Sequence, residues 1–69
     1  MNEDVLKGQW KQLVGSVKQQ WGKLTDDELT EIDGNREKLL GKLQERYGYA
    51  RNQAEQELDT YLETQRSQF

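Results

Sequence analysis

The sequence contains no cysteine, no histidine and no proline among its 69 residues. Without cysteine, the chain has no disulfide framework, no thiolate metal ligands and no thiol nucleophile. Without histidine, it lacks the usual general base near neutral pH and the commonest metal ligand in proteins. Apolar residues follow one another only in short runs such as Leu39-Leu40, which predicts neither a membrane span nor a signal-peptide core. We therefore expect a soluble intracellular protein that is not an enzyme, with no catalytic, cofactor-binding or metal-binding residues.

The composition limits the size of the core and the choice of partners. Charged residues make up 33% of the chain and hydrophobic residues 32%, and the formal net charge is -3. The length permits one small domain, covering residues 1–69. A chain this short buries only about 60% of its unfolded surface. Good helix caps, large aromatic residues or self-association must therefore contribute to its stability.

The first apolar stripe predicts a single helix from about Asp4 to Trp21. Plotted at about 100° per residue, its large apolar residues fall on one arc, as a core-facing helix requires; they are Leu6, Trp10, Leu13, Val14, Val17 and Trp21. Asn2 or Asp4 is expected to cap its start, and Gly22 is expected to end it in a left-handed conformation. Because both tryptophans lie on the arc, we expect them in the core and not on a membrane surface.

A capping box predicts the second helix. Thr25 is followed three residues later by Glu28, so that each side chain can accept a hydrogen bond from a free backbone N–H group near the other. The acidic residues in the first turn also face the positive end of the helix dipole. We expect a short helix over residues 26–33, with Gly34 as its stop.

Two further helices follow. Asn35 is expected to cap the third, Gly48 to end it, and one face to be buried through Leu39, Leu40, Leu43 and Tyr47. The fourth is expected from about Arg51 to Arg66, burying Ala54, Leu58, Tyr61 and Leu62. Ala50 is a poor cap for this helix, and Phe69 would extend its stripe.

The fold class is therefore all-α, a compact irregular array of four short helices. A shift of 26 residues aligns Leu13-Val14-Gly15 with Leu39-Leu40-Gly41 and Trp21-Gly22 with Tyr47-Gly48. This repeat suggests two similar packed αα-hairpins, although small helical proteins also reuse leucine and glycine without symmetry.

The acidic residues of the second helix do not form a metal motif. Five acids lie within residues 26–33, but alignment of Gly34 with the central glycine of a calcium loop places leucines at the first and last ligand positions. The segment Gly22-Lys23-Leu24-Thr25 likewise lacks the first glycine and the preceding strand of a phosphate loop. Helix capping and a solvated face explain these residues better than a bound ion.

The basic residues allow two interpretations. The lysines of the first helix form a stripe beside its apolar arc, and the third helix adds further cations; together they are Lys7, Lys11, Lys18, Lys42 and Arg46. They could contact phosphates in a weak nucleic-acid-binding protein. They could instead pair with the acidic second and fourth helices. A sequence pI near 4.9 favours the second interpretation, because dedicated nucleic-acid binders usually carry a basic balance.

Three glycines lie away from the apolar faces, namely Gly8, Gly15 and Gly41. Each costs about 1 kcal/mol relative to alanine inside a helix. We expect another backbone, from a partner or a second copy, to approach closely there; the alternative is a helix that bends and tolerates the loss.

The order of residues along the chain resembles the CsbD-like family of small bacterial proteins, and closely its enterobacterial YjbJ-type branch. The segments that carry the likeness are Trp21-Gly22-Lys23-Leu24-Thr25-Asp26-Asp27 and Gln44-Glu45-Arg46-Tyr47-Gly48. A departure is Ala50, where related sequences often have a polar residue that caps the next helix. The resemblance implies a cytoplasmic protein associated with the general stress response, without established catalytic residues. We expect it to act through its surface, by binding an unknown protein partner or by self-association.

Overall fold

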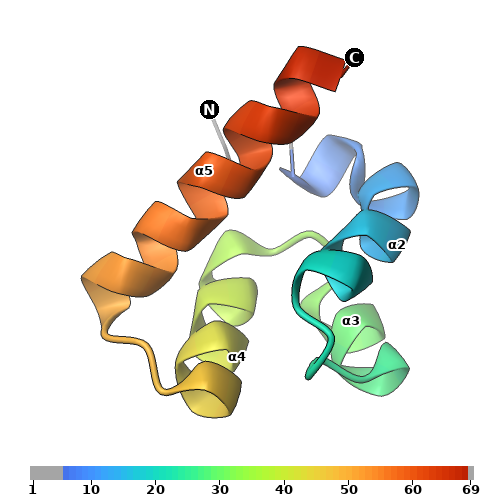
Figure 1. The fold of residues 1–69 in the computed structure, drawn as a ribbon. Helices are drawn as coiled ribbons and strands as arrows, with labels where there is room; N and C mark the ends of the chain where they lie inside the picture. The colour runs from blue at the N-terminus through green and yellow to red at the C-terminus, as the bar shows by residue number, and fades with distance from the viewer. Residues whose placement is uncertain (1–5, 69) are drawn as a thin grey trace.

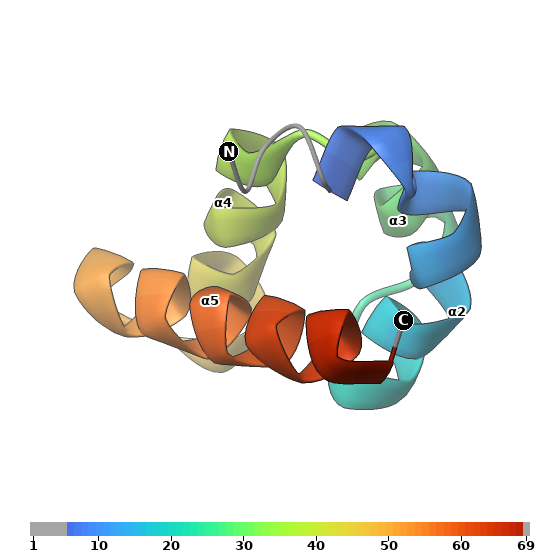
Figure 2. The same ribbon diagram turned by 90° about the horizontal axis from the view of Figure 1, so that it is seen from above.

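The computed structural model describes residues 6–68 and shows helices throughout, with no strand in that part of the chain. A helical stretch at residues 6–8 precedes the longer elements, which are α2 (Trp10–Gln20), α3 (Asp26–Ile32), α4 (Arg36–Tyr47) and α5 (Arg51–Gln68). Figures 1 and 2 show α5 along one side of the array, with α4, α3 and α2 arranged around the other sides. The all-α fold class is thus confirmed.

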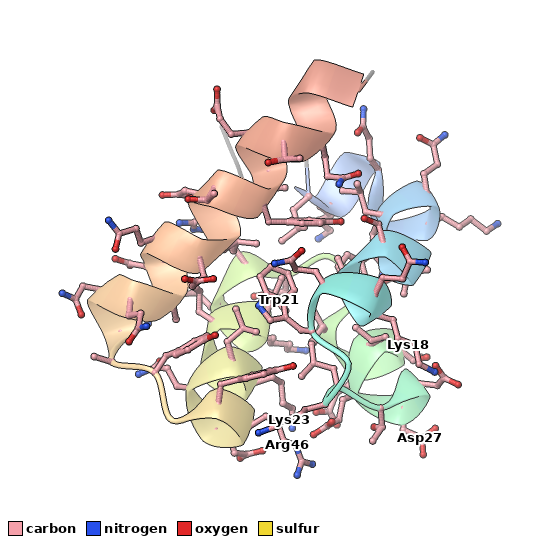
Figure 3. All side chains as sticks on the ribbon, viewed as in Figure 1. Lys18, Trp21, Lys23, Asp27 and Arg46 are labelled. Carbon is pink, nitrogen blue, oxygen red and sulfur yellow. The ribbon has the colours of Figure 1, made fainter. Side chains whose placement is uncertain are left out.

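The predicted apolar faces meet in one core. Trp21 is only 2% exposed and packs against Tyr61 of α5, with 5.1 Å between their ring centroids. Figure 3 shows the Trp21 side chain inside the array of helices. Every helix contributes to this core, which consists of Leu6, Trp10, Leu13, Val17, Trp21, Leu24, Leu29, Ile32, Leu39, Leu40, Leu43, Ala54, Leu58, Tyr61 and Leu62. Of the stripe residues predicted within 6–68, Val14 and Tyr47 are only partly buried at its edge.

The predicted starts of α3 and α4 and the predicted end of α4 are confirmed. Thr25 N donates to Glu28 Oε1 over 3.0 Å and Glu28 N donates to Thr25 Oγ1 over 3.1 Å, which completes the capping box of α3. Lys38 N donates to Asn35 Oδ1 over 3.0 Å at the start of α4. Gly48 ends α4 in the left-handed region, with φ 70°. These caps satisfy backbone groups that a helix leaves free at its ends.

The first predicted helix is interrupted at Gln9, and this corrects the expectation of one helix from Asp4 to Trp21. Gln9 has φ -114° and ψ 15° and forms the N-cap of α2. Glycine lowers helix stability, and Gly8 immediately precedes the interruption. The bend lets residues 6–8 pack across the turn between α3 and α4, where the backbone of Lys7 lies against Gly34. The proposed caps Asn2 and Asp4, and also Phe69, lie outside the described residues.

The turn after α2 also differs from the prediction. Gly22 does not adopt a positive φ, so it is not a left-handed stop. Instead α2 ends at Gln20, and Trp21 leaves the helix with φ -127° while its N–H group donates to Val17 O. Burial of the indole fixes this backbone direction, because the side chain must turn into the core.

The two halves of the chain are unequal. The second helix of the first half, α3, has 7 residues, whereas α5 has 18 and continues two residues beyond the predicted end at Arg66. Contacts also join α3 to α4, in addition to the pairs α2–α3 and α4–α5. The sequence repeat therefore does not give two hairpins of similar size.

The close approach of two backbones occurs at a glycine for which the sequence predicted only a helix stop. Gly34 has φ 78°, and a Cβ atom built there would lie 2.7 Å from Lys7 Cα and 3.1 Å from Trp10 Cβ. Asp33 before it forms the left-handed C-cap of α3, with φ 47°. Only glycine fits position 34, because both the space and the backbone conformation exclude a side chain.

The three glycines singled out from the sequence have no such neighbour. No atom within 4 Å would meet a Cβ atom at Gly8, Gly15 or Gly41. No segment of the described chain approaches these glycines, so the expectation that a partner or a second copy approaches them stays a prediction. For Gly8, the alternative of a bent helix agrees with the interruption at Gln9.

Candidate interaction surface

A groove lies between α2 and α3. Its apolar floor is formed by Trp10 and Val14 of α2 and by Leu29 of α3. Leu29 and Trp10 are buried and Val14 is partly exposed, so the floor is the edge of the core where two helices diverge. The open volume is about 540 Å³, which falls within the usual range for binding pockets. The polar lining consists of Lys11, Asp26, Thr30 and Asp33.

The two walls of this α2–α3 groove carry opposite charges. Lys11 and Lys18 project from α2, whereas Asp26 and Asp33 lie at the two ends of α3. Lys18 and Asp26 form an ion pair between exposed side chains. Lys11 and Asp33 are exposed and make no ion pair within residues 6–68. One lysine–aspartate pair, Lys18 with Asp26, is thus compensated, whereas Lys11 on the α2 wall and Asp33 on the α3 wall are unpaired in the described chain.

Three of the five basic residues suggested for nucleic-acid contact form ion pairs within the described chain. Lys42 lies 3.7 Å from Glu28, 3.6 Å from Glu31 and 3.7 Å from Glu45. Arg46 pairs with Glu28 and Lys18 with Asp26. The remaining two candidates, Lys7 and Lys11, have no acidic partner among the described residues. Pairing between basic and acidic helices therefore accounts for Lys18, Lys42 and Arg46.

Glu28 is the most strongly perturbed carboxyl group in the described chain. Its side chain is only 9% exposed, and its two oxygens accept hydrogen bonds from Thr25 N and from the guanidinium group of Arg46. The Arg46 hydrogen bond is the main reason why the pKa of Glu28 falls from 4.5 to about 2. Sequence reasoning identified its role in the capping box but missed Arg46, because no local pattern links residues 18 positions apart.

An aromatic cluster lies at the C-terminal end of α4. Tyr47 and Tyr49 stack with 5.4 Å between their centroids, and Lys23 Nζ lies 5.0 Å from the Tyr47 centroid. Lys23 N also donates to the Tyr47 hydroxyl oxygen over 3.2 Å. Figure 3 shows Lys23 and Arg46 at this lower end of the molecule. These contacts hold the turn after α2 against the end of α4, which gives the cluster a structural role.

Two further features of the described residues limit the range of sites. No helix among residues 6–68 combines the length and the apolar character that crossing a membrane requires. Within the same residues, no three acidic side chains converge as the ligands of a metal ion would. Glu28 serves instead in the capping box of α3, Asp26 pairs with Lys18, and Glu31 pairs with Lys42.

Comparison with known proteins identifies close relatives. The chain is 60% identical to the UPF0337 protein YjbJ of Escherichia coli K12 over 58 residues, which cover 84% of each chain. It is 60% identical to the UPF0337 protein PA4738 of Pseudomonas aeruginosa, over 84% of this chain and 89% of that protein. It is 53% identical to the UPF0337 protein pc0632 of Protochlamydia amoebophila, over 96% of this chain and all of that protein. The sequence profile of the CsbD-like family matches residues 4–56. The chain therefore belongs to the CsbD-like family, as its sequence motifs indicated.

Proposed function

We propose that this protein is a non-catalytic cytoplasmic protein of the bacterial stress response that acts by binding another protein molecule at the α2–α3 groove. The observation that carries the proposal is an apolar floor set between two walls with unpaired charges, Lys11 and Asp33. Covering apolar surface with another apolar side chain is favourable. Charges at the rim orient the partner and speed its association. The link to stress follows from the resemblance to the CsbD-like family.

The state of the perturbed carboxyl group supports action without catalysis. A general acid at neutral pH needs a raised pKa, whereas the pKa of Glu28 is lowered to about 2. Both of its oxygens already accept hydrogen bonds from Thr25 and Arg46. Glu28 therefore stabilises the helix array and is not available for proton transfer.

The proposal is tested with the protein immobilised as bait in extracts of stressed and unstressed bacteria. Val14→Asp places a charge on the groove floor, and Lys38→Asp changes an exposed residue outside the groove as the matched control. We expect specific proteins to be retained by the wild type and by Lys38→Asp, and to be lost with Val14→Asp. Circular dichroism confirms that each variant is folded. Retention of the same proteins by all three baits would contradict the proposal.

A further inference from the structure

We propose that the α2–α3 groove binds a second copy of this chain, related by a two-fold axis that runs along the groove, so that α2 of each copy lies against α3 of the other. The inference rests on the proposed function in that it assigns the occupant of the same groove. The order of charges along the two walls and the opposite directions of the two helices favour this occupant.

The helices that form the walls run in opposite directions. Lys18, near the end of α2, pairs with Asp26 at the start of α3. At the other end, Trp10 at the start of α2 lies against Gly34, just after the end of α3. Lys11 and Asp33 are the chain neighbours of these two residues. Lys11 and Asp33 thus line one end of the groove, and Asp26, paired with Lys18, lies at the other end.

This arrangement is its own electrostatic complement. A two-fold axis along the groove places the basic α2 wall of one copy over the acidic α3 wall of the other. Residues at one end of the groove in one copy then face residues at the same end in the other. Lys11 of each copy then faces Asp33 of the other, and Lys18 faces Asp26. In a two-fold interface every such contact occurs twice. An axis across the groove would instead place Lys11 over Lys18, where like charges repel.

The two charges that gain partners are those that lack them within one copy. Lys18 and Asp26 already compensate each other, whereas Lys11 and Asp33 are unpaired in the described chain. Opposite charges brought together at an interface fix its register. The formal net charge of -3 is small, so long-range repulsion between copies is modest.

The shape of α2 agrees with this placement. Val14 is partly exposed and presents apolar surface at the groove. Gly15 follows it, and no atom of the described chain lies within 4 Å of the position that its Cβ would occupy. A helix without a side chain at this position allows a neighbouring helix to approach closely.

Sedimentation equilibrium of the purified protein up to about 1 mM tests the inference, because that concentration detects even a weak dimer. Lys11→Asp and Asp33→Lys each place like charges at both contacts, and we expect each to weaken self-association about tenfold or more. In an equimolar mixture of the two variants, the introduced aspartate faces the introduced lysine, and native Asp33 faces native Lys11. The mixture should therefore form a heterodimer, detected by native mass spectrometry, with wild-type strength. Lys38→Asp and Asp27→Lys are matched controls outside the groove and should associate like the wild type.

A wild type that stays monomeric at this concentration, or a mixture that fails to restore association, would overturn the inference. Two variants that both fail to fold would be replaced by the double variant Lys11→Asp/Asp33→Lys, in which both contacts have opposite charges and association should persist. Monomeric wild type combined with loss of captured proteins in Val14→Asp would leave the proposed function standing. If Val14→Asp captures the same proteins as the wild type, and the mixture of Lys11→Asp and Asp33→Lys restores association, the dimer stands and the proposed function is overturned.

Discussion

Arg46 closes over Glu28 and donates to its Oε2 atom from Nε, over 2.8 Å, and from the guanidinium NH2 group. The other oxygen of the same carboxylate accepts the Thr25 N–H group of the capping box. The Glu28 side chain thus completes the N-terminal cap of α3 and also ties the start of α3 to the end of α4. A nearly buried charge is stable here because hydrogen bonds occupy both of its oxygens.

Acid should weaken the protein through Glu28. Its pKa in the folded chain is about 2, below the ordinary value of 4.5, so its contribution to stability is complete above pH about 4.5 and is lost as the pH falls towards 2. Glu28→Gln keeps an amide that can complete the capping box but removes the charge that Arg46 neutralises. We expect the difference in unfolding free energy between wild type and Glu28→Gln, measured with urea, to shrink from pH 6 to pH 2. Asp27→Asn is the control at an exposed carboxylate. An unchanged difference across this range would show that the Arg46 contact does not matter.

Gly34 should tolerate no side chain. Gly34→Ala forces a left-handed residue to carry a Cβ atom and places that atom 2.7 Å from Lys7 Cα. We expect a loss of about 3 kcal/mol or more in unfolding free energy, combining backbone strain with overpacking. Gly48→Ala is the matched control, since its φ of 70° is similar but its Cβ would meet open space; it should lose only about 1 kcal/mol. Equal losses at both positions would show that the contact with Lys7 is not tight.

Alanine at the open helical glycines should stabilise the monomer. Gly15 and Gly41 lie within α2 and α4, where alanine is favoured over glycine by up to about 1 kcal/mol. We expect Gly15→Ala and Gly41→Ala each to raise the melting temperature, measured by circular dichroism in dilute solution where the protein is monomeric. Destabilisation there would mean that these faces are packed in a way the structure does not show.

Loss of the central indole should unfold the protein. Trp21 is 2% exposed and packs against Tyr61. Trp21→Ala should cost about 3–5 kcal/mol, which is comparable to the whole stability of so small a core. Trp21→Phe keeps a ring in the same space and should remain folded. The check is far-ultraviolet circular dichroism with thermal unfolding, and a cooperative wild-type-like transition in Trp21→Ala would contradict the role assigned to this residue.

Nucleic acid should not bind with useful strength. Three of the candidate cations, Lys18, Lys42 and Arg46, already pair with carboxylates of this chain. A phosphate would have to displace these acids, and the remaining Lys7 and Lys11 offer only two phosphate contacts, which is too few for measurable affinity. Fluorescence anisotropy with labelled DNA and RNA should show no binding even at low salt. Saturable binding that weakens with salt and with Lys7→Ala/Lys11→Ala would restore the nucleic-acid interpretation.

The accuracy of the sequence predictions depended on the distance over which each signal acts. Thr25 and Glu28 are three residues apart, and Asn35 caps the amide of Lys38 at the same spacing, so these caps could be read directly. Gly22 looked equally local, but its conformation is set by the burial of Trp21 beside it. The interruption at Gln9 follows in the same way from how residues 6–8 pack across a later turn.

The candidate site was less predictable than the fold. Lys11 was identified as basic and exposed, yet the groove it lines needs Leu29 and Asp33 from another helix. Composition suggested that basic and acidic helices pair, and Lys42 with Glu31 confirms this, but the specific partner of Arg46 could not be derived from either residue.

The sequence alone determined the helical class, the main caps and most residues of the core, because apolar periodicity and capping act within one or two helical turns. Only the tertiary structure decided that Gly34 meets Lys7, that Arg46 neutralises Glu28 and that α2 and α3 diverge over an apolar floor. Each of these relationships joins segments on different helices, and it exists only when burial of the shared core has fixed how those helices pack.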